Sequence, residues 1–282
     1  MKVLVAGAAG MLGRAVVAEF SRRGCQVTAC TRNDMDITAI ETVRGKLTAA
    51  RPELVINCAA YTKVDGAEEE AYQAFLVNGL GAKNLALACR EHNADLVHIS
   101  TDYVFDGSKE GPYGIYDGTN PINTYGRSKL WGERAVAEIL PRHYIVRTSW
   151  LFGLGGRSFV ETMLRLFRER SKLEVVDDQR GAPTYTVDLA GALADLVTTR
   201  CYGTYHITNQ GLTSWYGFAR AIAASVRSPV EIIPCSTAQF PRPARRPANS
   251  ALDPFPLLET IGRLLPFWED ALARYLTKNR CE

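Results

Sequence analysis

The residues best suited to chemistry are Tyr125 and Lys129, four positions apart in a segment with helical spacing. This spacing places both side chains on one face of a helix. An ammonium group beside a phenol favours the phenolate and lowers the pKa of the tyrosine, which is otherwise about 10. We therefore expect Tyr125 to exchange a proton with a carbonyl oxygen, and Lys129 to tune it and to hold a ribose.

A third polar residue stands at the end of an apolar run, where Ser100, Thr101 and Asp102 follow residues 96–99. A hydroxyl in this place can hydrogen-bond a developing alkoxide. Taken alone, such a hydroxyl more often caps the end of a strand. Together with Tyr125 and Lys129, Thr101 indicates a catalytic group of three.

A glycine loop points to a dinucleotide cofactor. Gly7, Gly10 and Gly13 follow a short apolar run at residues 3–6 and precede a segment of helical spacing. Glycines allow a tight turn and a close approach of the backbone to phosphate, and the helix N-terminus offers free N–H groups. The order strand, loop and helix is the context that a pyrophosphate site requires.

The residues after the second expected strand bear on which cofactor is used. An acid there would accept the ribose hydroxyls of NAD, but the sequence reads Cys30-Thr31-Arg32-Asn33. A guanidinium matches phosphate geometry, so Arg32 predicts NADPH as the preferred cofactor, with NADH left open as a second one. A solvated surface arginine fits the sequence about equally well.

Strands and helices alternate along the first half of the chain. Apolar runs predict strands at residues 3–6, 27–31, 54–56, 96–99 and 144–146. Helical spacing predicts helices at 12–23, 37–50, 67–92 with a break near 79–81, and 125–140. This alternation predicts an α/β fold, a Rossmann-type doubly wound parallel sheet whose ligand site lies at the carboxyl ends of its strands.

The second half is less regular and predicts a smaller C-terminal α/β substrate domain. Its helices are expected at 159–170, 187–199 and 214–225, with strands at 173–176 and 203–207. We assign residues 1–150 to an NAD(P)-binding Rossmann domain, to which 178–200 return. Residues 151–177 and 201–282 then form the substrate-binding domain.

Charge and cysteines exclude several classes of function. The 282 residues carry 33 basic and 30 acidic side chains, a net charge of +3, which gives no reason to expect nucleic acid or an anionic membrane as partner. Seven cysteines without a CxxC motif argue against a disulfide framework and a structural zinc site. No stretch approaches the roughly 20 apolar residues of a membrane span. We expect a cytoplasmic protein.

Several segments together resemble the dTDP-4-dehydrorhamnose reductase family, in the extended branch of the short-chain dehydrogenase/reductase superfamily. The segments are residues 57–65, 100–107, 125–129, 147–150, 178–184 and 245–250. The resemblance implies hydride transfer from a nicotinamide to C4 of dTDP-4-dehydro-L-rhamnose, giving dTDP-L-rhamnose.

The resemblance also implies roles for individual residues. The glycines, Arg32, Tyr125 and Lys129 are already expected to bind the cofactor. The resemblance implies further cofactor-binding residues, which are Met11, Leu12, Asp36, Ile37, Ala59, Ala60 and Tyr61. It assigns the sugar nucleotide to Thr62, Val64, Thr101, Asp102, Tyr125 and Trp150. An indole suits a sugar, since it is an apolar platform with one donor, although a core tryptophan is the alternative.

The sequence departs from the family at one position. Some members bridge two subunits with Mg²⁺ held by glutamates, one of them two residues after the third glycine. That position is Ala15 here, and hard cations need oxygen ligands. We therefore expect no metal, and a monomer or a metal-independent homodimer.

Three alternatives to this function remain open. The first is a reductase of another nucleotide-linked 4-keto-6-deoxy sugar, with the same chemistry and a different product. The second is a non-catalytic NADP-binding regulatory subunit, which intact Thr101, Tyr125 and Lys129 disfavour. The third is an epimerase that keeps its NAD.

Other charged residues receive weaker interpretations. His98 and His206 lie in strand-like runs and are expected to be core histidines. Residues 68–70, three glutamates, are expected to form a solvated first helical turn. The cluster of Arg242, Arg245 and Arg246 is either a solvated loop or, as we favour, a group that closes over the nucleotide diphosphate.

Overall fold

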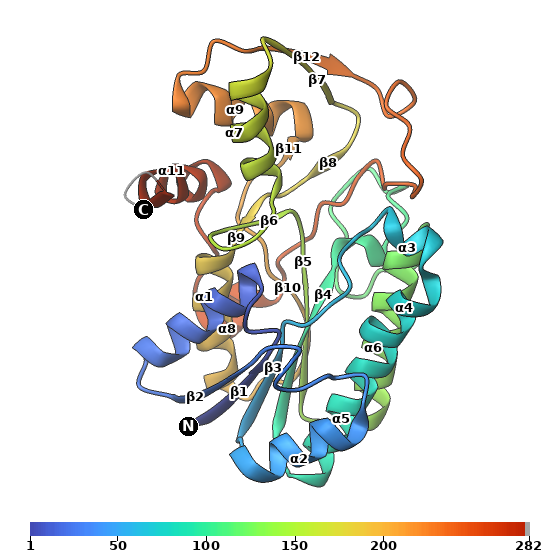
Figure 1. Ribbon diagram of the computed structural model, residues 1–282, viewed down its shortest axis with the longest axis vertical. Coiled ribbons are helices and arrows are strands. Elements are labelled where there is room, and N and C mark those ends of the chain that lie inside the picture. Colours follow the sequence, from blue (N-terminus) through green and yellow to red (C-terminus); the bar gives the residue numbers. More distant parts are fainter. Residues whose placement is uncertain (280–282) are drawn as a thin grey trace.

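A six-stranded parallel sheet forms the centre of the protein, as seen in a computed structural model that describes residues 1–279 (Figure 1). The strand order is β10-β5-β4-β3-β1-β2, and every neighbouring pair is parallel. The chain order reverses between β1 and β3, which is the switch point where doubly wound sheets bind ligands. The sheet and the helices on its two faces are called the body below.

The elements of the body alternate as the sequence predicts. Its strands are β1 (Lys2–Ala6), β2 (Gln26–Cys30), β3 (Leu54–Asn57), β4 (Asp95–Thr101), β5 (His143–Thr148) and β10 (Gly203–His206). Its helices are α1 (Met11–Arg22), α2 (Ile40–Ala50), α3 (Gly66–Glu69), α4 (Ala71–Phe75), the π-helix η1 (Leu76–Leu80), α5 (Gly81–Glu91), the 3₁₀ turn η2 (Asp102–Val104), α6 (Thr124–Ile139), α8 (Thr186–Thr199) and α10 (Leu257–Ile261).

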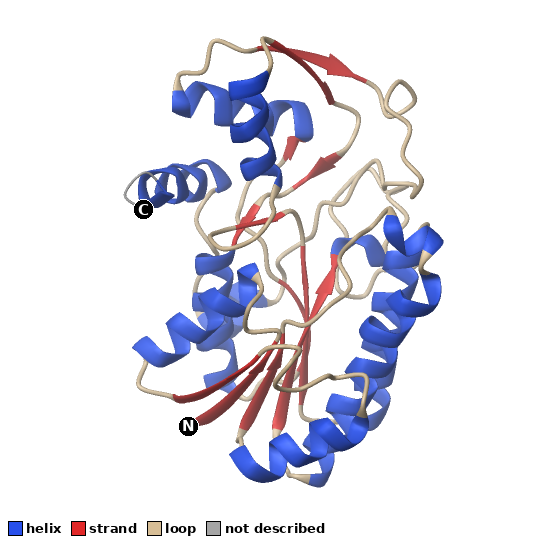
Figure 2. Cartoon of the chain, in the orientation of Figure 1, coloured by secondary structure: helices blue, strands red, loops and turns tan. Residues whose placement is uncertain are grey.

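Helices cover both faces of the sheet, so its strands are apolar throughout (Figure 2). On one face α1 and α8 pack against alternate strand residues such as Val3 and Val5. On the other face α2, α5 and α6 pack against the residues between them, such as Leu4 and Ala6. The two packed faces fix the carboxyl ends of β1, β3 and β4 at one edge, where the candidate site lies.

A smaller α/β unit, called the cap below, stands over that edge. It contains α7 (Phe159–Glu169), β7 (Lys172–Val176), β8 (Arg180–Gly181), β11 (Thr213–Ser214), α9 (Trp215–Val226), β12 (Glu231–Cys235) and α11 (Trp268–Asn279). Its own apolar cluster joins Phe152, Phe218, Trp268 and Tyr275. Two short strands, β6 (Leu151–Phe152) and β9 (Thr184–Tyr185), pair where the cap meets the body.

The chain passes between body and cap more often than the sequence indicates. Helix α8 packs on α1, as expected, but β8, which also falls within residues 178–200, pairs with β11 of the cap. Strand β10 pairs with β5 at the edge of the main sheet, however, and α10 packs on α8. Both segments fall within residues 201–282, which the sequence analysis assigned to the substrate domain, so that assignment is wrong for them. The assignment of cofactor binding to one domain and of substrate binding to the other remains a prediction.

Two expected helices differ in detail from the structure. The helix expected at 37–50 begins at Ile40, because the Asp36 carboxylate accepts the Thr38 N–H at 2.9 Å and holds a turn. The helix expected at 67–92 is interrupted at Glu70. Near Gly79, where the break was expected, the chain stays helical and forms the π-helix η1. Within residues 1–279, no helix is long and apolar enough to cross a bilayer.

Candidate active site

The glycine loop brings two backbone segments into contact at the end of β1. Gly7 has a φ of +72°, and a Cβ there would lie 2.6 Å from the Ala59 backbone nitrogen. Any larger residue would push the segment after β3 away. Gly10 then precedes α1 and offers no side chain to its first turn. Met11, Leu12 and Gly13 of that turn line a cavity, and the first N–H groups of a helix have no partner within the helix.

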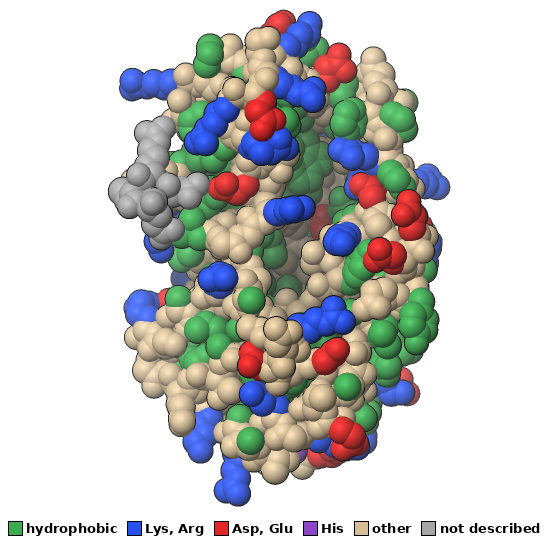
Figure 3. Space-filling model, viewed as in Figure 1, with side chains coloured by type: hydrophobic (Ala, Val, Ile, Leu, Met, Phe, Trp, Pro, Cys, Tyr) green, Lys and Arg blue, Asp and Glu red, His purple; other side chains and the backbone are tan. Residues whose placement is uncertain are grey.

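Two cavities meet beside this loop. The first has a volume of about 510 Å³ and reaches from the glycine loop to the ends of β4 and β5. The second, of about 650 Å³, reaches from the loop to the end of β2. They share Gly10, Cys58, Ala59, Ala60 and Thr62, so together they form one trough across the switch point. A hollow between body and cap is visible in Figure 3, with basic side chains around it.

The trough brings together most of the residues that the sequence singled out. The first cavity is lined by Gly10, Met11, Leu12, Gly13, Ala59, Ala60, Thr62, Thr101, Asp102, Tyr125, Lys129 and Trp150. The second is lined by Gly7, Gly10, Arg32, Asp36, Ala59, Ala60, Tyr61 and Thr62. Two predicted residues line neither cavity: Ile37 is buried in the core against Gly81, and Val64 is half-buried nearby.

Helix α6 presents Tyr125 and Lys129 to the first cavity. Asn123 begins the helix by accepting the Gly126 N–H at 2.8 Å, which fixes the register of its first turn. The Lys129 side chain is 2% exposed, and its Nζ donates to the Ile99 carbonyl at 2.5 Å. Burial lowers the pKa of this ammonium to about 8, so it remains mainly charged at neutral pH.

The phenol of Tyr125 behaves differently from the sequence prediction. Burial raises its pKa to about 12, a hydrogen bond with Thr101 opposes the shift, and the charge of Asp102 adds to it. The lowering by Lys129 that the sequence analysis expected is not found, and desolvation of the phenolate sets the direction of the shift. Tyr125 is therefore protonated at neutral pH, which is the form a proton donor needs.

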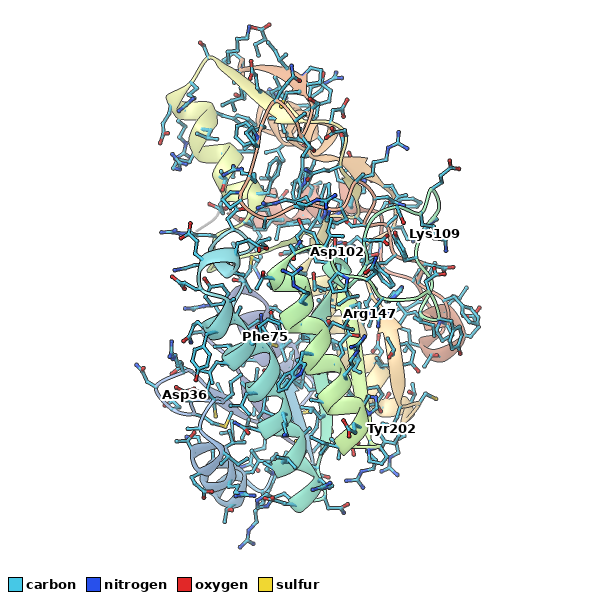
Figure 4. The ribbon with its side chains drawn as sticks, turned by 90° about the vertical axis from the view of Figure 1, so that its right-hand side faces the viewer. Asp36, Phe75, Asp102, Lys109, Arg147 and Tyr202 are labelled. Atoms are coloured by element: carbon cyan, nitrogen blue, oxygen red, sulfur yellow. The ribbon has the colours of Figure 1, made fainter. Side chains whose placement is uncertain are left out.

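Thr101 and Asp102 stand together at the end of β4. The Thr101 hydroxyl donates to Asp102 Oδ1 at 2.9 Å and accepts the Tyr103 N–H at 3.2 Å. Asp102 is 3% exposed, and its Oδ2 accepts no hydrogen bond of good geometry among the described residues, because the nearby Ser250 hydroxyl donates to the Arg180 carbonyl instead. Burial raises the pKa of the carboxyl to about 6. Figure 4 shows Asp102 where the body meets the cap.

Trp150 enters the first cavity from the end of β5. Its φ is +48°, an uncommon conformation for a residue with a large side chain. Its ring stacks on Trp215 of α9 with centroids 3.5 Å apart and planes 5° from parallel. The tryptophan pair therefore joins the body to the cap at the edge of the cavity.

Arg32 lies at the mouth of the second cavity. Its side chain is 75% exposed, and Nε lies 3.8 Å from Asp36 Oδ2, a weak surface pair. The neighbouring Asp34 is engaged with the backbone and hydroxyl of Thr31 at 2.9 and 2.6 Å. A guanidinium with one loose partner is therefore available to an anionic group at this end of the trough.

The sequence analysis missed several residues that line the first cavity. They are Cys58, Ile99, Ser100, Thr148, Ser149, Leu151, Gly156 and Arg157. Those at strand ends could have been found, because the carboxyl ends of parallel strands share one edge. Gly156 and Arg157 lie in the loop before α7, and no local pattern marks that loop as part of a site.

The weaker interpretations of charged residues have mixed outcomes. His98 and His206 are buried and neutral, since burial lowers both pKa values, that of His206 to about 3. The expected solvated turn is wrong for Glu68, which accepts the Thr124 N–H and hydroxyl at 2.8 Å each. Residues 1–279 contain no group of three His, Cys, Asp or Glu side chains that could hold a metal ion.

The chain is similar to known proteins over most of its length. The profile of the family described as RmlD substrate binding domain matches residues 1–281. A dTDP-4-dehydrorhamnose reductase of Burkholderia thailandensis is 42% identical, over 96% of this chain and 97% of its own. A dTDP-4-keto-6-deoxy-D-glucose reductase of Streptomyces niveus is 48% identical over 77% of this chain and 76% of its own.

A solved structure extends the likeness to three dimensions. The dTDP-4-dehydrorhamnose reductase of Bacillus anthracis, determined in complex with NADP, superimposes with a TM-score of 0.95 at 41% identity. The match covers 99% of this chain and 100% of that one. With the family profile spanning almost every residue, the chain belongs to the RmlD substrate binding domain family.

Proposed function

We propose that this protein is a dTDP-4-dehydrorhamnose reductase that uses NADPH to reduce the C4 ketone of dTDP-4-dehydro-L-rhamnose to dTDP-L-rhamnose. The observation that carries the proposal is the meeting of Thr101, Tyr125 and Lys129 in the cavity onto which the glycine loop opens. Family membership and the names of the relatives support the choice of sugar nucleotide.

The trough fits a dinucleotide. Arg32 and Asp36 would hold the adenosine end in the second cavity, whose wall includes Gly7, where a Cβ would clash with the Ala59 backbone. The first turn of α1 would bind the pyrophosphate through its N–H groups and its positive dipole end. Lys129 and Tyr125 would hold the nicotinamide ribose. The bound reduced nicotinamide supplies the hydride.

The protein's own part in the reaction is proton transfer. Tyr125 donates its phenolic proton to the C4 oxygen as charge develops there, and Thr101 hydrogen-bonds the same oxygen or the phenolate. The Lys129 ammonium, held by the Ile99 carbonyl, stabilises the phenolate that remains. Thr101 and Lys129 are buried and Tyr125 is half-buried, which strengthens these interactions by limiting the access of water.

The sugar would lie between Asp102 and Trp150. Asp102 Oδ2 is buried and accepts no hydrogen bond of good geometry among the described residues, so a sugar hydroxyl could satisfy it. The indole of Trp150 offers an apolar platform in the cavity that Thr62 also lines, and a contact of Val64 with the sugar stays a prediction from the family resemblance. Because the Trp150 ring stacks on Trp215, this platform has little freedom to move.

The decisive test is oxidation of NADPH with freshly made dTDP-4-keto-L-rhamnose. The fall in absorbance is followed in solution, the product is identified, and NADH is assayed in parallel. We expect turnover to dTDP-L-rhamnose. A folded protein that binds NADPH but leaves this substrate unchanged would contradict the proposal.

One alternative substrate class has a specific observation in its favour. The Streptomyces niveus relative is named for dTDP-4-keto-6-deoxy-D-glucose, which differs in stereochemistry but not in the reacting group. The same assay with that sugar separates the two functions by their ratio of kcat/KM. A non-catalytic regulatory subunit is disfavoured because Thr101, Tyr125 and Lys129 all line the first cavity.

NADPH preference depends on Arg32 in this proposal. Arg32→Gln is expected to lower kcat/KM for NADPH by about 10- to 150-fold, since one charge-assisted hydrogen bond contributes about 1.5–3 kcal/mol. The value for NADH should change by less than about two-fold, because NADH has no 2′-phosphate. Equal losses with both cofactors would show that Arg32 does not discriminate between them.

We place the reaction in the cytoplasm. The cysteines at 25, 30, 58, 89, 201 and 235 are all free thiols, in keeping with a reducing compartment, and Cys281 lies outside the described residues. The partner is a small nucleotide sugar. With Ala15 where some members carry a glutamate, the protein works as a monomer or as a homodimer without a bridging metal.

A further inference from the structure

A strap of residues 236–250 runs from the end of β12 in the cap back to the body (Figure 1). It carries three arginines and three prolines. The strap is fastened to the body near the candidate site by polar contacts. The Ala244 N–H donates to Asp65 Oδ1 at 3.2 Å, and Asn123 donates to the Arg245 carbonyl at 2.8 Å.

Arg246 makes the strongest of these fastenings. Its two terminal nitrogens pair with the two carboxylate oxygens of Asp65, Nη2 with Oδ2 at 2.9 Å. Nη1 also donates to the Ala244 carbonyl at 2.6 Å. The guanidinium holds the pKa of Asp65 below its usual range. Arg246 is thus committed to a protein carboxylate, and the expected role of the Arg242, Arg245 and Arg246 cluster over the diphosphate stays a prediction.

The same guanidinium reaches the neighbour of the proton donor. The guanidinium lies close enough to the Tyr103 phenol to oppose the rise in pKa that burial causes there. The ring of Tyr103 packs edge-on against Tyr125, with centroids 6.0 Å apart and planes at 78°. A Cβ on Gly126 would lie 2.1 Å from the Tyr103 carbonyl, so η2 and the start of α6 are in direct contact.

Asp65, at the other end of the ion pair, is also close to the trough. It directly precedes α3 and follows residues 59–63, which line one or both cavities. One guanidinium therefore joins three parts: the strap, the segment that follows β3, and the aromatic ring that supports Tyr125. Each part comes from a different region of the chain.

We propose that Arg246 is a positioning residue for ketone reduction, which clasps the strap to Asp65 and holds Tyr125 in place through Tyr103. This inference rests on the function proposed above. Arg246 touches no reacting atom, so its effect must pass through the geometry of the proton donor. Small displacements of such a group are costly, since a shift of about 1 Å can lower a rate about 100-fold.

The kinetic test compares Arg246→Gln with the wild-type protein. We expect kcat to fall about ten-fold or more, with KM for NADPH changed less than about two-fold. The isotope effect on kcat, measured with NADPH deuterated at the transferred position, should rise as the chemical step becomes slower. A merely structural role would lower the active fraction without raising this isotope effect. Arg246→Lys should recover part of the loss.

Two further variants keep the test decisive. Asp65→Asn removes the same ion pair from the other side, and it serves if Arg246→Gln does not fold. Arg44→Gln is the matched control, because Arg44 makes a comparable two-point pair with Glu91 on the surface of the body. A wild-type kcat and isotope effect in both Arg246→Gln and Asp65→Asn would overturn the proposal.

Trypsin gives a measurement that does not depend on activity. Within the strap, Arg242 and Arg246 are each followed by proline, which blocks trypsin, so cleavage falls after Arg245. Loss of the clasp should speed cleavage after Arg245 in Arg246→Gln and Asp65→Asn, but not in Arg44→Gln. If the wild-type protein fails to reduce the sugar, the proposed function is wrong, but the trypsin result still tests the contact between Arg246 and Asp65. Unchanged cleavage in both Arg246→Gln and Asp65→Asn would show that this contact does not hold the strap.

Discussion

Tyr125→Phe is expected to lower kcat for ketone reduction by about 10²–10⁴-fold, the usual contribution of a positioned general acid. The substitution removes the only proton that the phenol can give and keeps the ring that packs against Tyr103. Because burial raises the pKa of Tyr125 to about 12, the wild-type donor stays protonated across the working pH range. The measurement is steady-state NADPH oxidation, with NADPH binding followed separately.

Tyr144→Phe provides a matched control for this result. Tyr144 is fully buried in β5, and its hydroxyl has no hydrogen-bond partner among the described residues. Removing that hydroxyl should leave kcat within about two-fold of wild type, since it faces no reacting group. If Tyr125→Phe retained comparable activity, another residue would have to be the proton donor.

Glu133→Gln is expected to destabilise the fold by about 3–5 kcal/mol, the cost of breaking a buried ion pair from one side. Glu133 on α6 accepts from Arg147 on β5 at 2.7 and 3.0 Å, and both side chains are almost fully buried. The remaining neighbours of the guanidinium are the Phe105 ring at 5.1 Å and neutral His206 at 3.4 Å. Neither can neutralise its charge.

Urea unfolding, followed by circular dichroism, measures this loss. The control is Glu91→Gln, which removes the acid of the exposed pair with Arg44 and should cost less than about 1 kcal/mol. Similar losses in the two variants would mean that the Glu133–Arg147 pair is hydrated or dispensable. Because Lys129 lies one turn from Glu133 on α6, activity should be compared under conditions in which both variants remain folded.

Local patterns predicted the strands and the glycine loop of the body correctly, because β1, β3 and β4 are buried on both faces and their apolar runs are unambiguous. The π-helix at 76–80 could not be predicted in this way. Gly79 lies under the ring of Trp131, whose Cε3 would be 2.1 Å from a Cβ. That contact joins two helices far apart in sequence. The pairing of β10 with β5 at the edge of the main sheet also joins distant parts of the sequence, so local patterns cannot predict it.

The residues of the candidate site also fall into two groups, those that local motifs reveal and those that depend on contacts between distant parts of the chain. Thr101, Tyr125 and Lys129 belong to short motifs, so spacing and a family resemblance suffice to find them. Trp215 and Arg246 stand more than sixty residues away from their partners Trp150 and Tyr103. Their contacts follow from how the cap sits on the body, and no periodicity in the sequence carries that information.

The repeated passage of the chain between body and cap bears on how the protein is synthesised. The apolar cluster of the cap includes Trp268, Leu272 and Tyr275 from α11, the last described helix. Those residues leave the ribosome after all other parts of the cluster. While translation continues, Phe152 and Phe218 lack these neighbours. The cap can therefore complete its core only after α11 has left the ribosome, whereas β1 to β5 can pair earlier.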